Sequence, residues 1–212
     1  MSIGDIAQRC SLAGEPAAIL WDMDGTLVDS EGEWARATGE VVSRHGGSWL
    51  AQDVEFALGA SQEAHANRMV DALARDGITA DPGALFAEVV DTVAEHFHTD
   101  LEFMPGAREL LEGFRAAGIP QVLVSASPQR LVDIFVASCP EGTFAATVTG
   151  DDQVPSKPDP APYRLGAQKV GVEPERCLAF EDSPHGIQSA TICGATTVDV
   201  NRISLRELAE LL

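Results

Sequence analysis

The sequence predicts an α/β fold, a doubly wound parallel sheet that carries an inserted block of helices. Short, continuously apolar segments alternate with helical patterns, which is typical of a parallel sheet covered on both faces. Between residues 29 and 103 the pattern is helical throughout, with no strand-like segment. We therefore expect a core formed by residues 1–28 and 104–212, and a separate helical domain formed by residues 29–103.

Length and composition limit the possible functions. The chain has 212 residues, of which 45% are hydrophobic, enough for a core domain with an insertion. A formal net charge of −19 repels nucleic acid and anionic membranes, so we expect neither as a partner. No segment approaches the roughly 20 apolar residues of a membrane span, and the beginning of the chain lacks the apolar core of a signal peptide. The four cysteines are far apart and form no CxxC, so we expect a reducing cytoplasm as the compartment. A monomer is the default expectation for the oligomeric state.

The first part of the chain contains one expected strand and the helical block. Residues 1–16 are expected to form a short N-terminal extension, and residues 17–22 form an apolar strand. The helices of the following block are separated by turns at Gly46-Gly47, Leu58-Gly59 and Asp81-Pro82-Gly83.

Four further strands are expected in the second part of the chain, each preceded by a helix. The strands are 121–124, 146–149, 176–180 and 196–200; the helices are 106–118, a helix from 128, 158–170, 184–193 and a final helix at 204–212. Ligands of such sheets bind at the carboxyl ends of the strands. We therefore expect the functional residues directly after strands.

Two aspartates follow the first strand. In extended backbone the side chains of Asp22 and Asp24 point to the same side, and Gly25 permits a sharp turn. Two close carboxylates repel each other unless a cation lies between them or one of them keeps its proton. The pair predicts either a divalent cation site or a nucleophile beside a general acid, and a solvated Asp-Gly turn is the plainer alternative.

A serine-containing turn follows the second strand. We expect Ser127 to be the N-cap of the next helix and Pro128 its first residue. The amides at this helix start and the hydroxyl of Ser125 suit an anion. Capping alone is the alternative explanation.

The third and fourth strands end in a lysine and in two acids. Lys157 lies in a proline-rich loop and is suited to neutralise a phosphate, although most lysines are simply solvated. Glu181 and Asp182 complete an oxygen-rich cluster with the first two aspartates, able to hold Mg²⁺. The four strand ends together are hard to explain as unrelated surface features.

These four strand ends resemble the motifs of the haloacid dehalogenase-like phosphohydrolases. The matching segments, in order, are Asp22-Met23-Asp24-Gly25-Thr26, Ser125, Lys157 and Glu181-Asp182, and the resemblance extends from residue 17 onwards. The chain is most similar to the branch with a small α-helical cap, subfamily I, which contains sugar-phosphate phosphatases, phosphoglycolate phosphatases and β-phosphoglucomutase. Residues 29–103 would then be the cap.

The resemblance implies a Mg²⁺-dependent phosphatase, a phosphoric monoester hydrolase acting on a small phosphorylated metabolite such as a sugar or polyol phosphate. Asp22 would be the nucleophile that forms an aspartyl phosphate, and Asp24 the general acid and base. The implied phosphate-binding residues are Thr26, Ser125, Ala126 and Lys157, and the implied metal site consists of Asp22, the main-chain carbonyl of Asp24, and Asp182, with Glu181 nearby.

A sugar phosphomutase is the main alternative. Two positions argue against it: Trp34 replaces the mutase's cap histidine, and Gln62 replaces the arginine that follows a Gly-x-Ser of the cap. A phospho-accepting signalling module is more remote, since such modules carry neither a cap nor an acid at the position of Asp24. For His65 we expect a solvated or capping role, or packing on a helix face, rather than a ligand role.

Overall fold

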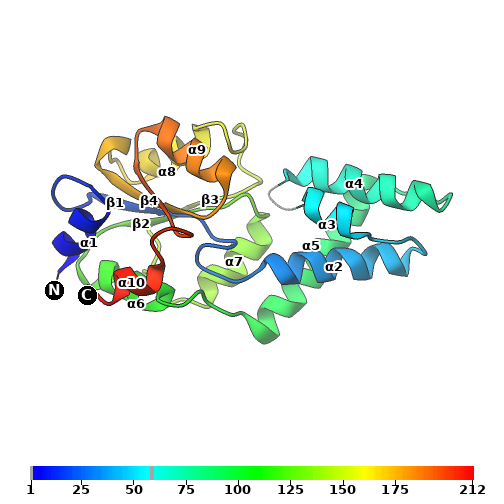
Figure 1. Ribbon diagram of the computed structural model, residues 1–212, viewed down its shortest axis with the longest axis horizontal. Coiled ribbons are helices and arrows are strands. Elements are labelled where there is room, and N and C mark those ends of the chain that lie inside the picture. Colours follow the sequence, from blue (N-terminus) through cyan, green and yellow to red (C-terminus); the bar gives the residue numbers. More distant parts are fainter. Residues whose placement is uncertain (1, 58–59) are drawn as a thin grey trace. The chain divides into compact units, whose positions relative to one another are not determined.

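The computed structural model describes residues 2–57 and 60–212, and it divides into two compact units. One unit combines Met1–Asp29 with Glu102–Leu212, and the other is Ser30–Leu101 (Figure 1). The turn expected at Leu58-Gly59 lies outside the described residues. Each unit has its own core and is described by itself.

The first unit contains a five-stranded, fully parallel sheet with the strand order β3-β2-β1-β4-β5. The predicted α/β class is thereby confirmed. The strands are β1 (Ala18–Trp21), β2 (Gln121–Val124), β3 (Ala146–Val148), β4 (Cys177–Glu181) and β5 (Thr196–Asp199). Because β1 is central and pairs with both β2 and β4, the residues that follow these three strands come together at one edge of the sheet.

Helices cover both faces of the sheet (Figure 1). Leu20 and its neighbours on one face pack with Tyr163 of α8 (Ala161–Lys169) and Ala190 of α9 (Pro184–Cys193). On the other face Trp21 stacks on Phe180 with a ring-centroid distance of 4.2 Å and also contacts Phe114 of α6. The remaining elements of this unit are α1 (Ile3–Arg9), α6 (Ala107–Ala116), α7 (Gln129–Ala137), the 3₁₀ turn η1 (Pro174–Arg176) and α10 (Leu205–Ala209).

Helix α1 corrects the expectation of a plain N-terminal extension. A capping box between Ser2 and Asp5 begins the helix, and Ile6 and Ala7 are buried. Seven residues give too few helical turns for a clear periodic pattern, and burial against the rest of the unit stabilises this helix instead.

The second unit is entirely helical in its described part, as expected. Its helices are α2 (Glu31–Arg44), α3 (Ala51–Ala57), α4 (Gln62–Arg75) and α5 (Pro82–Asp100). A fully buried Asp53 lies between Arg68 and Arg75, at 2.7 and 2.5 Å, which ties α3 to α4.

Of the roles expected for His65, helix-face packing is the one that the structure shows, and a solvated role is wrong. His65 is buried and packs against the rings of Trp34, Trp49 and Phe86, which come from different parts of the helical unit. Its Nε2 forms a hydrogen bond of 3.0 Å with the hydroxyl of Thr38. Burial lowers the pKa of His65 to about 4, so the ring is neutral at pH 7.

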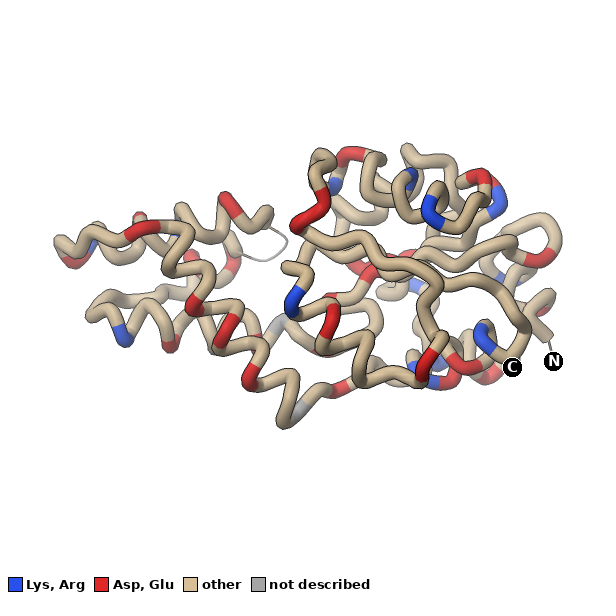
Figure 2. Tube along the Cα trace, turned by 180° about the vertical axis from the view of Figure 1, so that it is seen from behind, with Lys and Arg blue, Asp and Glu red and all other residues tan. Residues whose placement is uncertain are grey.

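Acidic residues are spread along the chain in both units (Figure 2), in keeping with the net charge of −19. Within the described residues, no helix combines the length and the apolar character that crossing a membrane requires. All four cysteines are free thiols.

Candidate active site

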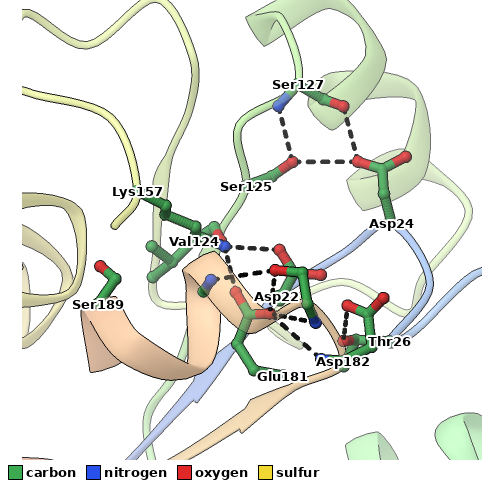
Figure 3. A network of polar contacts seen from close by, with 12 residues as sticks. Asp22, Asp24, Thr26, Val124, Ser125, Ser127, Lys157, Glu181, Asp182 and Ser189 are labelled. Carbon is green, nitrogen blue, oxygen red and sulfur yellow. Dashed lines mark hydrogen bonds and ion pairs between the residues drawn. The ribbon is translucent and has the colours of Figure 1, made fainter. Parts of the chain in front are cut away.

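The centre of the site is the ammonium group of Lys157. Its Nζ lies 2.7 Å from Oδ1 of Asp22, 2.6 Å from Oε1 of Glu181 and 2.9 Å from the carbonyl oxygen of Val124 (Figure 3). A lysine ammonium has three protons, and these three acceptors use all of them. The lysine is therefore not a solvated surface residue: its side chain is 9% exposed and links the ends of β1, β2 and β4.

Glu181 holds Lys157 in place. Its Oε1 accepts hydrogen bonds from Lys157 and from the phenol of Tyr163, at 2.8 Å from the latter. Its Oε2 accepts from the backbone N–H groups of Asp182 and Ser183 and from the Ser183 hydroxyl, at 3.2, 3.2 and 3.0 Å. Five donors engage the two oxygens of a carboxylate that is completely buried. Tyr163 was not predicted as part of this site.

Two glycines allow the carboxylates of Glu181 and Asp182 to lie close to the backbone. A Cβ at position 186 would overlap the carboxylate of Glu181, and a Cβ at position 25 would overlap that of Asp182. Gly25 also has a φ of +81°, which disfavours other residues. The small residues after the first and fourth strands are thus required by the packing of the site itself.

Asp182 is oriented by Thr26. The Thr26 hydroxyl donates to Oδ1 of Asp182 at 3.1 Å, and the Thr26 N–H donates to the carbonyl of Met23. Thr26 was expected to bind phosphate, but its hydroxyl and its N–H both donate to other residues of the protein. Asn201, which the sequence did not single out, donates to the Asp182 carbonyl at 2.7 Å.

Asp24 lies with the serines that follow β2. Its Oδ2 accepts from the hydroxyl of Ser127 at 2.6 Å and from that of Ser125 at 3.3 Å (Figure 3). Ser125 Oγ in turn accepts from the Ser127 N–H at 2.9 Å. Ala126 is exposed between the two serines. The predicted N-cap role of Ser127 was wrong, because α7 begins after Pro128 without a side-chain cap from the serine.

The site carries an excess of negative charge. Burial raises the pKa of Asp22 well above the ordinary aspartate value, and the charge of Glu181 raises it further, against the effect of Lys157. Burial and the charge of Glu181 also raise the pKa of Asp182 to about 6. Burial alone would lower the pKa of Lys157, but the charges of Asp22 and Glu181 outweigh it and raise this pKa, so the lysine is protonated. The single positive charge of Lys157 therefore does not neutralise the combined negative charge of Asp22, Glu181 and Asp182.

A divalent cation fits this arrangement. Asp22, Glu181 and Asp182 each place one carboxylate oxygen within 4.8 Å of the other two. Oxygen ligands in such a group are those that Mg²⁺ prefers, and the cation would offset the charge excess. The side chain of Asp24 is turned to the serines instead, and only its main-chain carbonyl was expected to bind the metal.

A sequence model of the haloacid dehalogenase-like hydrolases matches residues 16–194. The chain belongs to this family. The residues matched include all four strand ends and the whole helical unit, so the resemblance stated from the motifs is confirmed.

Several curated relatives of the chain are named as phosphatases. It is 32% identical over 188 residues to a hexitol phosphatase of Escherichia coli, covering 86% of this chain and 82% of that protein. It is 29% identical over 187 residues to a fructose-1-phosphate phosphatase of the same organism, covering 87% and 96%. The predicted enzyme class, a phosphoric monoester hydrolase, is confirmed.

A solved structure shows the same fold. CbbY from Rhodobacter sphaeroides, crystallised in complex with phosphate, superimposes with a TM-score of 0.77 at 24% identity, over 86% of this chain and 84% of that chain. This likeness confirms the fold class, an α/β core with a helical insertion.

Proposed function

We propose that this hydrolase is a Mg²⁺-dependent phosphatase that cleaves a small phosphorylated carbohydrate or polyol through an aspartyl phosphate on Asp22. The observation that supports this most is the cluster at the sheet edge. Carboxylate oxygens of Asp22, Glu181 and Asp182 lie within 4.8 Å of one another, and Lys157 Nζ is 2.7 Å from Asp22 Oδ1. A nucleophile held beside a cation and a metal site suits phosphoryl transfer.

In this proposal Asp22, Asp182 and the main-chain carbonyl of Asp24 would hold Mg²⁺, which would supply positive charge beside the phosphate. Glu181 positions Lys157 and does not bind the ion directly, because its oxygens already accept five hydrogen bonds. Thr26 orients Asp182 through its hydroxyl.

The reaction has two steps. The Asp22 carboxylate attacks phosphorus, the bond to the leaving oxygen breaks, and Asp24 gives its proton to that oxygen. Asp24 then takes a proton from the water that attacks the aspartyl phosphate, which releases phosphate and restores Asp22. During both steps the Ser125 hydroxyl and the Ala126 N–H bind the phosphate oxygens, and the charge of Lys157, held beside Asp22, offsets the negative charge of those oxygens.

We propose that the helical unit, Ser30–Leu101, is the cap that selects the substrate and excludes water from the first step. The names of the two curated relatives, a hexitol phosphatase and a fructose-1-phosphate phosphatase, support a sugar or polyol phosphate. Trp34 and Gln62, where a mutase would carry histidine and arginine, favour hydrolysis over transfer within a sugar.

The test is release of inorganic phosphate from 4-nitrophenyl phosphate with Mg²⁺, followed by a panel of hexose and hexitol phosphates. The wild-type protein is expected to release phosphate, and Asp22→Asn to lose this activity. Asp133→Asn, a change at an exposed aspartate of α7, is the matched control and keeps it. Wild-type turnover by Asp22→Asn would refute Asp22 as the nucleophile.

A further inference from the structure

Ser127, a residue outside the site predicted from the sequence, donates a short hydrogen bond to the Asp24 carboxylate. The hydroxyl of Ser127 lies 2.6 Å from Asp24 Oδ2, against 3.3 Å for the hydroxyl of Ser125. A hydroxyl that donates to a carboxylate at this distance forms a strong, charge-assisted hydrogen bond. Ser127 is 6% exposed, so water competes little for this contact.

Helix capping does not account for Ser127. The N–H of Gln129, at the start of α7, donates to Oδ2 of Asp151 at 2.9 Å, and Asp151 comes from the loop after β3. The carboxylate of Asp151 therefore binds the N–H at the start of α7, the helix that Ser127 was expected to cap. The hydroxyl of Ser127 is left to bind Asp24.

The backbone of Ser127 is fixed on both sides. Its N–H donates to Ser125 Oγ at 2.9 Å, and its carbonyl accepts from the N–H of Gly150 at 2.8 Å. The first bond closes the serine turn and the second ties it to the loop after β3, so the Ser127 hydroxyl has a defined position relative to Asp24.

Substrate binding affects the hydrogen bonds of the two serines differently. Each hydroxyl has one proton to donate. In the proposed reaction the Ser125 hydroxyl donates its hydrogen bond to a phosphate oxygen. It then no longer donates to Asp24. Ser127 can keep its contact with Asp24 throughout.

We infer that Ser127 is a positioning residue, which holds the Asp24 carboxylate in place for proton exchange with the leaving oxygen while Ser125 binds phosphate. The inference rests on the proposed function, since it takes Asp24 as the general acid. It concerns a serine that acts through Asp24 and not on the substrate.

The experiment compares Ser127→Ala with the wild-type protein on two substrates of nearly equal size, 4-nitrophenyl phosphate and phenyl phosphate, with Mg²⁺. Nitrophenolate leaves without a proton, whereas phenolate is a poorer leaving group and needs a proton from Asp24. The value of kcat/KM is measured because it reports the first step and excludes hydrolysis of the aspartyl phosphate. We expect kcat/KM to fall roughly tenfold to hundredfold for phenyl phosphate and less than about threefold for 4-nitrophenyl phosphate.

Three further variants serve as a control, a rescue and a substitute for the alanine variant. Ser138→Ala removes a hydroxyl that bonds the Phe135 carbonyl at the other end of α7, and it is expected to leave both values unchanged. Ser127→Thr keeps a hydroxyl and should restore most of the loss on phenyl phosphate. Ser127→Cys, with a weak donor of similar size, repeats the comparison if the alanine variant melts at a lower temperature.

An equal loss on both substrates, or no loss, overturns the positioning role. If the wild-type protein hydrolyses neither ester, the proposed function itself fails. The two failures are thus separate.

Discussion

Lys157 and Glu181 form a buried ion pair in which Nζ and Oε1 are 2.6 Å apart. The same ammonium bonds Asp22 and the Val124 carbonyl, so three acceptors from three strand ends surround one compact charge. A planar guanidinium directs its donors in a fixed fork and does not match this arrangement.

Lys157→Arg is therefore expected to lower kcat/KM for phosphate esters by at least about tenfold, although the charge is kept. The control is Lys169→Arg, because Lys169 is a more exposed lysine that bonds the Thr147 carbonyl in the same unit. Enzyme assays of both variants at saturating Mg²⁺ check this, and an Lys157→Arg enzyme with wild-type kcat/KM would show that charge alone suffices.

Metal binding is expected to stabilise the folded protein through Asp182. At a Mg²⁺ concentration about one hundred times the dissociation constant, the melting temperature should rise by roughly 5–10 °C, because the ion binds the folded state and offsets the carboxylate charges. Asp182→Asn should lose most of this rise, whereas Glu112→Gln, at an exposed acid of α6, should keep it. Thermal melting with and without chelator measures both. A shift that persists in Asp182→Asn would place the ion elsewhere.

His65 is expected to make stability fall in mild acid. Its pKa is about 4 in the folded protein against 6.5 ordinarily, so between these values the unfolded chain binds the proton and the folded chain does not. The stability that depends on the neutral ring is present above pH 6.5 and is lost as the pH falls towards 4. At pH 5 the loss is roughly 2 kcal/mol relative to pH 7.

Urea denaturation of His65→Gln at pH 7 and pH 5 tests this prediction. Glutamine does not titrate, so the variant should lose roughly 2 kcal/mol less than the wild-type protein between the two pH values. His45→Gln, at a surface histidine paired with Glu88, should behave like the wild type. Equal pH dependence in His65→Gln and wild type contradicts a neutral buried His65.

The sheet could be predicted from the sequence because its strands are short, continuously apolar and separated by helical patterns. Asp22, Lys157 and Asp182 could be placed near one another because each follows, at a strand end or in the loop after it, one of a set of parallel strands. The structure brings Lys157 against Asp22, and Asp182 within the same carboxylate cluster.

The features that sequence reasoning missed depend on contacts between distant segments. Ser127 looked like an N-cap because a serine before proline commonly is one, and nothing local shows that Asp151 serves Gln129. His65 looked isolated because its aromatic neighbours, Trp34 and Phe86, belong to other helices. Such partners are set by tertiary packing, which the local pattern does not encode.

The most direct measurement of the central claim, the aspartyl phosphate on Asp22, uses Asp24→Asn in rapid-mixing experiments with 4-nitrophenyl phosphate and Mg²⁺. Nitrophenolate leaves without a proton, but hydrolysis of the aspartyl phosphate needs Asp24 as base. We predict a burst of about one nitrophenolate per enzyme followed by slow turnover, and a phosphoryl group on the peptide that contains Asp22 after acid quenching. Release without a burst, together with an unmodified Asp22 peptide, would contradict the account.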